Sequence, residues 1–464
     1  MYSGQPNSAA WLPLRLPGRA ALAALKQRWR DGGDRLLAQR MAGAAFMIRA
    51  GGAVVVYLSQ IFLARWIGSS EFGVYVYVWT WVLLIGDTVH LGLASAAQRF
   101  IPEYTQQRAM ALLRGFLFGS RMVVFAAASG VALLGAFGIW MLEPWIARYE
   151  LIPLYLACAT LPFYALSNML DGLARSYSWI TVALAPPYLI RPVILIVLMA
   201  AAHMSGLAMD AATAMTAALC ATWATAIVQL LVLNRRLASQ VQAGPKTFDF
   251  KDWFSTSLPI LVVWGFYTLL TYTDVLLLQQ FRPPHEVAHY YSASKTLAFV
   301  AFVYFAVSAS VAHKFAQYHF AGDRARLAEF LSDTIRWTFW PSLAAAVFVL
   351  AFGKLFLGLF GSDFVDAYPL MFVLAIGLLA RAAVGPAERL LNMLGEQRAC
   401  AGVYLAAFAA NAVGCLLLIP TYGALGAAIA TASALVIESS LLFFVTRQRL
   451  GLHLLVFGRS ASSA

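Results

Sequence analysis

Twelve runs of about 20 apolar residues dominate this sequence, and a helix needs about that length to cross the hydrocarbon core of a bilayer. Hydrophobic residues make up 61% of the 464-residue chain, against about 45–50% in soluble proteins. The pattern therefore predicts an all-α polytopic membrane protein and argues against a soluble enzyme or a nucleic-acid partner. The expected spans are 42–64, 73–97, 115–141, 151–170, 179–201, 208–234, 253–280, 288–312, 336–360, 367–388, 399–419 and 423–446.

The basic residues indicate how these spans are oriented. An even number of spans places both ends of the chain on one side, and 24 Lys and Arg residues fall on that side. The opposite loops hold only Arg65, Arg148, Arg282 and Lys354. Because cytoplasmic loops accumulate Lys and Arg, we expect both termini in the cytoplasm. The accumulation of basic residues in cytoplasmic loops then explains the excess of 33 Lys and Arg over 21 Asp and Glu.

The spans and loops divide the chain into five parts. We expect a basic cytoplasmic segment over 1–40, a six-helix bundle over 41–235 and a cytoplasmic linker over 236–252. A second six-helix bundle over 253–447 and a cytoplasmic tail over 448–464 follow. Since each bundle has six spans, the two halves have the same orientation in the membrane.

An internal repeat supports the division into halves. A shift of 215 residues aligns Tyr57 with Tyr272, Glu71 with Glu286, Tyr75 with Tyr290 and Phe100 with Phe315. Parallel repeats of this kind occur in transporters, where the substrate site lies at the interface between the halves. We therefore expect two parallel bundles around a central cavity.

Charged residues inside spans are functional candidates, because each costs about 2.5–3.5 kcal/mol at the centre of a helix on insertion scales. The expected spans contain five basic residues, three acidic residues and one histidine. They are Arg49, Arg121, Arg191, Lys295, Arg381, Asp87, Asp274, Glu438 and His90. Of these, Arg121 is close enough to the end of its span to reach the cytoplasm, which gives it a topological role.

Depth within the spans predicts which charges meet. Arg49 lies at the depth of Asp87 and His90, and the latter two are three residues apart on one helical face. These three residues form one expected cluster. The alternative is that the charges are salt bridges that only hold helices together.

Two further pairings follow from depth. Asp274 and Lys295 lie on either side of a short hairpin, and Arg381 is expected opposite Glu438. Arg191 has no obvious acidic partner, so it either binds a ligand or caps carbonyls freed by Pro186 and Pro187.

A net positive cavity suits an anionic substrate, because arginine pairs with phosphate oxygens through two hydrogen bonds. We expect Arg49, Lys295, Arg191 and Arg381 to bind substrate. Asp87, His90, Asp274 and Glu438 are expected to act in ion coupling or charge pairing. No metal-ligand cluster, catalytic constellation or nucleotide-binding loop is present in the sequence, so we expect no cofactor and no enzymatic activity.

The stretch Leu63 to Tyr75, LARWIGSSEFGVY, and the later QRFIPEY of Gln98 to Tyr104 resemble the amino-terminal signature of bacterial Wzx-type polysaccharide flippases. These belong to the multidrug/oligosaccharidyl-lipid/polysaccharide (MOP) exporter superfamily, and the resemblance covers about residues 40–447. It implies two six-helix bundles and a cavity lined by the first, second, seventh and eighth helices.

The same resemblance implies a function in the bacterial inner membrane. A flippase of this kind moves oligosaccharide on an undecaprenyl pyrophosphate-type lipid from the cytoplasmic to the outer leaflet, for cell-surface polysaccharides such as lipopolysaccharide. Coupling to H⁺ or Na⁺ is compatible with the acidic residues in the spans. The alternatives are a cation-coupled drug antiporter of the same superfamily and a membrane-embedded glycan-modifying enzyme.

Overall fold

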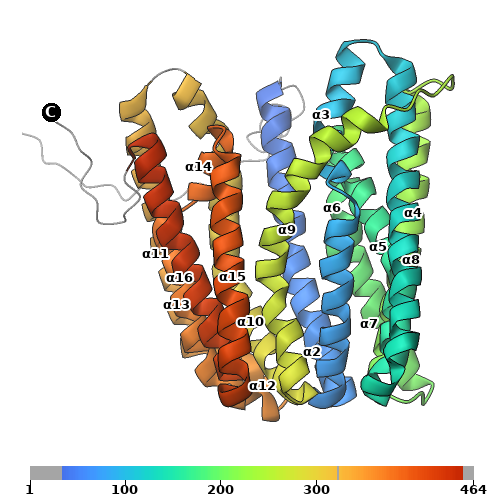
Figure 1. Cartoon of the computed structure of the whole chain (residues 1–464), viewed down its shortest axis with the longest axis vertical. Helices are drawn as coiled ribbons and strands as arrows, with labels where there is room; N and C mark the ends of the chain where they lie inside the picture. The colour runs from blue at the N-terminus through green and yellow to red at the C-terminus, as the bar shows by residue number, and fades with distance from the viewer. Residues whose placement is uncertain (1–33, 321–322, 453–464) are drawn as a thin grey trace, which may run out of the picture.

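The computed structural model describes residues 34–320 and 323–452, which form a bundle of long helices (Figure 1). The predicted segment 1–40 therefore lies mostly, and the tail 448–464 largely, outside the described residues. The first half contains α2 (Asp34–Val89), α3 (Leu93–Gln106), α4 (Met110–Leu142), α5 (Arg148–Ser176), α6 (Ile180–Ala185), α7 (Arg191–Met204) and α8 (Ala211–Gln240). The second half contains α9 (Phe250–Phe281), α10 (Pro284–Phe320), α11 (Arg324–Ala351), α12 (Gly353–Gly358), α13 (Tyr368–Val384), α14 (Ala387–Met393), α15 (Gln397–Tyr422) and α16 (Ala424–Leu450).

The predicted all-α membrane fold is confirmed. Over 34–320 and 323–452 there is no strand, and eleven continuous helical segments are long and apolar enough to cross a membrane. The first of them, Gly43–Gln106, contains two of the twelve predicted spans. It bends at Gly68, whose φ of 79° and ψ of 166° are accessible to glycine without strain. The bend returns the chain through the membrane, so the helix bounds agree with twelve spans.

Several helix boundaries differ from the predicted spans because of local backbone chemistry. The linker expected at 236–252 is shorter, since α8 continues to Gln240 and the Asp249 side chain caps α9 by accepting a hydrogen bond from the amide of Asp252 at 3.1 Å. The tenth span stops at Val384, where Gly385 has a φ of 61°. The helix between α6 and α7 widens into one π-helical turn, Pro186–Ile190, because prolines lack the amide that an α-helix requires.

The two halves lie side by side, and α11, α13, α15 and α16 of the second half diverge from the first half toward the end of the molecule where α14 lies, whereas α9 stays packed against α3 there (Figure 1). We call this the termini end, and the opposite end, where α12 lies and α2 bends, the Gly68 end. Within the first half, α5 packs against α4 and α8; within the second, α15 packs against α9 and α16. Between the halves, α2 packs against α9 and α10.

The aligned residues of the repeat occupy corresponding places in the two halves. Tyr75 in α2 and Tyr290 in α10 are both buried, and Phe100 and Phe315 are completely inaccessible to solvent. The halves differ where α2 ends and α3 begins, because α10 passes through the corresponding position without a break.

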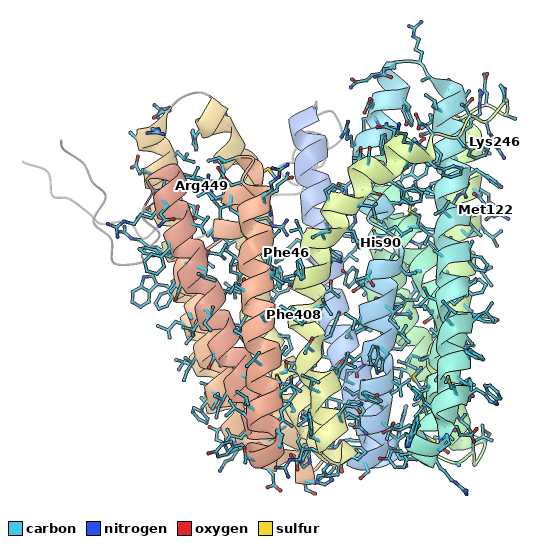
Figure 2. All side chains as sticks on the ribbon, in the orientation of Figure 1. Phe46, His90, Met122, Lys246, Phe408 and Arg449 are labelled. Carbon is cyan, nitrogen blue, oxygen red and sulfur yellow. The ribbon has the colours of Figure 1, made fainter. Side chains whose placement is uncertain are left out.

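Apolar side chains also cover the outside of the bundle, as a bilayer requires. On α4, Leu133 and Leu134 are 73% and 72% exposed, and Met122 points away from the helices (Figure 2). No residue in the described part of the protein buries these side chains, so lipid is the solvent that suits them.

Candidate functional site

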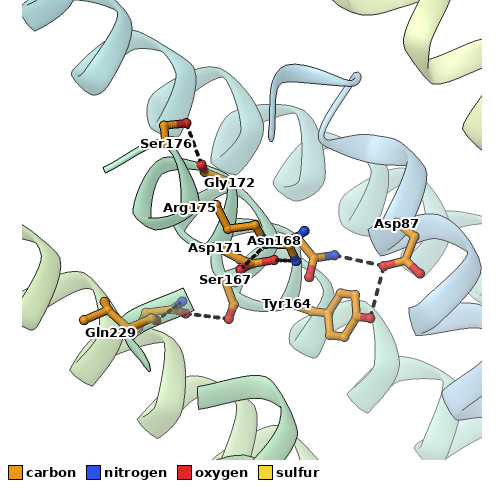
Figure 3. Close-up of polar contacts among 10 residues, drawn as sticks. Asp87, Tyr164, Ser167, Asn168, Asp171, Gly172, Arg175, Ser176 and Gln229 are labelled. Carbon is orange, nitrogen blue, oxygen red and sulfur yellow. Dashed lines mark hydrogen bonds and ion pairs between the residues drawn. The ribbon is translucent and has the colours of Figure 1, made fainter. Parts of the chain in front are cut away.

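A carboxylate of the first half, Asp87 near the end of α2, faces α5 rather than solvent. It accepts hydrogen bonds from the Tyr164 hydroxyl at 3.1 Å and from the Asn168 amide at 2.9 Å (Figure 3). Tyr164 and Asn168 are four residues apart, so both project from one face of α5. Neither residue is predicted from the sequence as a partner of Asp87.

Arg191 is the first residue of α7, directly after the π turn. Its guanidinium lies over two aromatic rings, 5.4 Å from the centroid of Trp79 and 5.3 Å from that of Tyr164. It is within electrostatic range of Asp87, but within the described part of the chain no carboxylate lies within 4.0 Å of it. The partly buried charge of Arg191 is thus held by aromatic faces, which attract cations.

The expected cluster of Arg49, Asp87 and His90 is wrong: neither a hydrogen bond nor an ion pair joins any two of them. The reason is that α2 ends at Val89, so His90 leaves the helical face that carries Asp87. Its Nδ1 instead accepts a hydrogen bond from the amide of Gly92 at 3.1 Å and stabilises the break before α3. Arg49 is exposed, with its guanidinium 6.0 Å from the ring centroid of Tyr188.

In the second half, Asp274 is 5% exposed and its carboxylate is satisfied by neighbours other than Lys295. The hydroxyls of Tyr290 and Thr431 donate to it, as does the amide of Val275 at 2.8 Å. Lys295 is within electrostatic range of Asp274 but forms no direct ion pair with it. Its ammonium lies 4.8 Å from the ring centroid of Tyr291.

Arg191 and Lys295 come from different halves but belong to one region. Tyr75 of α2 lies near both Arg191 of the first half and Tyr291, the ring beneath Lys295. Tyr272 of α9 lies near Asp87, Tyr164 and Tyr291. The interface between the halves is therefore lined by aromatic rings and hydroxyls, with one cation contributed by each side.

Arg381 and Glu438 form the ion pair that their depth suggested. The guanidinium nitrogen and carboxylate oxygen are 3.2 Å apart, and the side chains are 13% and 0% exposed. The Arg381 guanidinium also lies 5.1 Å from the ring centroid of Tyr304. This pair lies inside the second half and neutralises itself, so Arg381 differs from Arg191 and Lys295 in having no charge left for a ligand.

Arg121 also has a structural role, beside the topological one that the sequence predicts. It donates to Asn234 at 2.6 Å, joining α4 to α8. Another polar pair that the sequence analysis missed, Asp171 with Arg175, lies on the same helix as Tyr164 (Figure 3). Its i, i+4 spacing was the available signal. The residues with described coordinates include no group of three His, Cys, Asp or Glu side chains that would hold a metal ion.

Comparison with known proteins identifies the fold. Residues 259–417 match the MatE family model. A multidrug-resistance MATE transporter of the MOP superfamily, solved in an inward-facing conformation, is 14% identical, with 88% of this chain and 98% of that chain covered and a TM-score of 0.71. A search of curated protein sequences found no match.

Two further solved structures are similar. The lipid II flippase MurJ, in an inward closed conformation, is 14% identical over 87% of each chain, with a TM-score of 0.65. A MOP-superfamily transporter from Pyrococcus furiosus, described as having a binding pocket of reversed polarity, is 13% identical over 91% of this chain and 97% of that chain, with a TM-score of 0.66. The chain therefore has the fold of MOP-superfamily transporters, which include proteins with different substrates.

Proposed function

We propose that this protein is a transporter that moves lipid-linked oligosaccharide from the cytoplasmic to the outer leaflet of the bacterial inner membrane by alternating access. The observation that carries the proposal is the pair of cations at the interface, Arg191 from one half and Lys295 from the other. Each lies against aromatic rings, and neither forms an ion pair with a carboxylate of residues 34–320 or 323–452.

Two unneutralised cations suit a diphosphate headgroup. Phosphate oxygens accept charge-assisted hydrogen bonds, and arginine offers two parallel donors for this purpose. Arg49 of α2 is exposed beside Tyr188, in the π turn that precedes Arg191, and is the third cation of the proposed anion site. Arg381 is left out, because Glu438 neutralises it.

The remaining lining suits a sugar. Tyr291 lies beside Lys295, and Tyr164 and Trp79 lie beside Arg191, so tyrosines and an indole ring flank both cations. Such side chains offer both apolar area and hydrogen bonding. In the proposed transporter the glycan occupies this interface while its lipid chain remains in the bilayer.

Asp87 and Asp274 supply a means of ion coupling, one in each half. Each carboxylate interacts with a cation of the site, Arg191 or Lys295, without pairing directly with it. A phosphate group that binds these cations would neutralise their positive charge. The carboxylates would then lose the favourable interaction with that charge. We propose that H⁺ or Na⁺ binding at either aspartate offsets this change during the cycle.

A drug antiporter is the competing function. The match of 259–417 to the MatE family model and the similarity to a multidrug-resistance transporter favour it. The positive charge of the interface disfavours it, because a site for cationic drugs requires the opposite sign. A glycan-modifying enzyme lacks support, since the site offers no arrangement of nucleophile and base.

The test is glycan export by single variants in a strain lacking the chromosomal copy. Arg191→Ala and Lys295→Ala should abolish surface polysaccharide while the protein reaches the membrane at normal levels. The matched controls are Arg236→Ala and Lys354→Ala, which remove exposed cations that also lie over rings, those of Trp179 and Tyr368. Both controls should export normally.

Two results would overturn the proposal. Normal surface glycan in both the Arg191 and Lys295 variants would remove the phosphate site. Ion-dependent efflux of a cationic dye by the purified protein in liposomes, together with unchanged glycan in the deletion strain, would establish the antiporter instead.

A further inference from the structure

The halves are joined at the Gly68 end by polar contacts between side chains of opposite halves. Tyr57 and Thr296 share a hydrogen bond of 3.0 Å, and Gln280 donates to the Tyr77 hydroxyl at 3.1 Å. A fifth side chain, Arg65, reaches across from α2 to α12. Arg65 is the basic residue among these contacts; Glu150 of α5 also takes part in a contact between the halves, accepting a hydrogen bond from Gln279 of α9 at 2.7 Å. The sequence predicted no function for Arg65 beyond topology.

Arg65 donates to two backbone carbonyls of the other half. Its Nε donates to the Leu359 oxygen, and its terminal Nη2 donates to the Gly358 oxygen at 3.2 Å. These carbonyls end α12, and the last carbonyls of a helix have no amide partner within it. A guanidinium satisfies them with charge-assisted hydrogen bonds, which are stronger than neutral ones.

An aromatic cluster lies directly behind these carbonyls. Phe72 of α2 is completely buried and contacts Phe360 and Phe364 of the second half, with ring centroids 6.4 Å and 6.1 Å apart. Since Leu359 immediately precedes Phe360, the hydrogen bonds of Arg65 hold this segment against Phe72. Separation of the halves at this end would break the hydrogen bonds and expose the rings together.

Arg282 provides an internal comparison. It lies at the same end and also donates to the last carbonyls of a helix, those of Ile419 at 3.2 Å and Pro420 at 3.0 Å. Its carbonyl partners belong to α15, in its own half. The two arginines thus have the same chemistry, but only Arg65 joins one half to the other.

We propose that Arg65 is the latch that keeps the transporter closed at the Gly68 end, and that its hydrogen bonds to Gly358 and Leu359 break and re-form in each cycle. The inference rests on the proposed function only in assuming that the halves open alternately. It assigns to Arg65 a positioning role in the conformational equilibrium and no contact with the substrate.

Distances between spin labels test the latch without substrate. Cys158, Cys220, Cys400 and Cys415, all free thiols, are replaced by serine. One label pair, at exposed Leu207 and Ser362, reports on the Gly68 end, and another, at exposed Gln107 and Gln397, reports on the termini end. Pulsed electron paramagnetic resonance then measures the distance between the two labels of each pair, with the protein in lipid nanodiscs.

Arg65→Ala should raise the ratio of open to closed molecules at the Gly68 end by about fivefold, a change appropriate to the net loss of one solvent-exposed hydrogen bond. The termini end should close correspondingly. Arg282→Ala should leave both distance distributions unchanged.

Unchanged distances in the Arg65 variant would overturn the latch, as would an equal change in the Arg282 variant, which would indicate a general effect of lost helix capping. Because no glycan is present, these outcomes are independent of the export assay that tests the proposed substrate.

Discussion

Glu71 and Glu286, 215 residues apart, make the same contact in the two halves. The carboxylate of Glu71 accepts a hydrogen bond from the amide of Ala211, the first residue of α8, at 2.9 Å. That of Glu286 accepts one from Ala424, the first residue of α16, at 3.0 Å. Each glutamate therefore caps the last spanning helix of its own half, and the repeat seen in the sequence extends to the tertiary contacts.

Removal of either cap should destabilise the protein. Glu71→Ala and Glu286→Ala should each lower the free energy of unfolding by about 0.5–2 kcal/mol, since they leave helix amides without an acceptor. Denaturant unfolding in detergent micelles measures the change. Glu103→Ala is the control, because Glu103 forms an exposed i, i+4 pair with Arg99 and such pairs contribute little. Equal losses in all three variants would contradict the capping role.

The ion pair of Arg381 and Glu438 should respond very differently to single and double substitution. Arg381→Met alone leaves the completely buried carboxylate of Glu438 without its cationic partner. This should lower the free energy of unfolding by about 3–5 kcal/mol. The double variant with Glu438→Leu removes both charges and should recover most of that loss. Thermal unfolding of the four proteins in the cycle gives the coupling. A double variant as unstable as the single one would show that the pair contributes through packing alone.

The bend at Gly68 should tolerate no side chain. Gly68→Ala places a Cβ on a residue with φ of 79° and ψ of 166°, so we expect a loss of about 1–3 kcal/mol from backbone strain. Gly51→Ala is the matched control within the same helix, since nothing lies within 4 Å of a Cβ there. It should be neutral or stabilising in the same unfolding assay. Equal stability of the Gly68 variant and the parent would be incompatible with this conformation.

The aromatic support of Arg191 should contribute to anion binding. Trp79→Leu removes one of the rings beneath the guanidinium, and we expect affinity for inorganic pyrophosphate to fall by about 2- to 30-fold, the range that a cation–π contact supplies. Titration calorimetry with purified protein measures it. Trp179→Leu removes the ring beneath Arg236, away from the interface, and should leave the affinity unchanged. An unchanged affinity for pyrophosphate in the Trp79 variant would show that this ring does not contribute to anion binding.

The spans could be predicted from the sequence because their signal is local. A run of apolar residues long enough for a bilayer must be a helix, since each backbone amide and carbonyl then finds its partner within the segment. The prolines before Arg191 and the glycine at 385 moved the helix boundaries by only a few residues, because their effect on the backbone is local too.

The partners of the buried charges were harder to predict. The pairing of Arg381 with Glu438 followed from depth, since the lengths of two spans set how far each residue lies from the ends. The cluster predicted for Arg49, Asp87 and His90 was wrong, because the depth of a residue does not determine which neighbouring helix its side chain faces. A three-residue break, between Val89 and Leu93, was enough to separate His90 from Asp87.

The sequence alone determined that this chain crosses the membrane as helices in two like-oriented halves, because hydrophobic length and charge distribution act on each segment separately. Only the tertiary structure decided that Asp87 binds Tyr164 and Asn168, that Arg191 rests on Trp79, and that Arg65 joins α2 to the end of α12. These contacts connect helices far apart in the chain, and packing between such helices depends on all their surfaces at once.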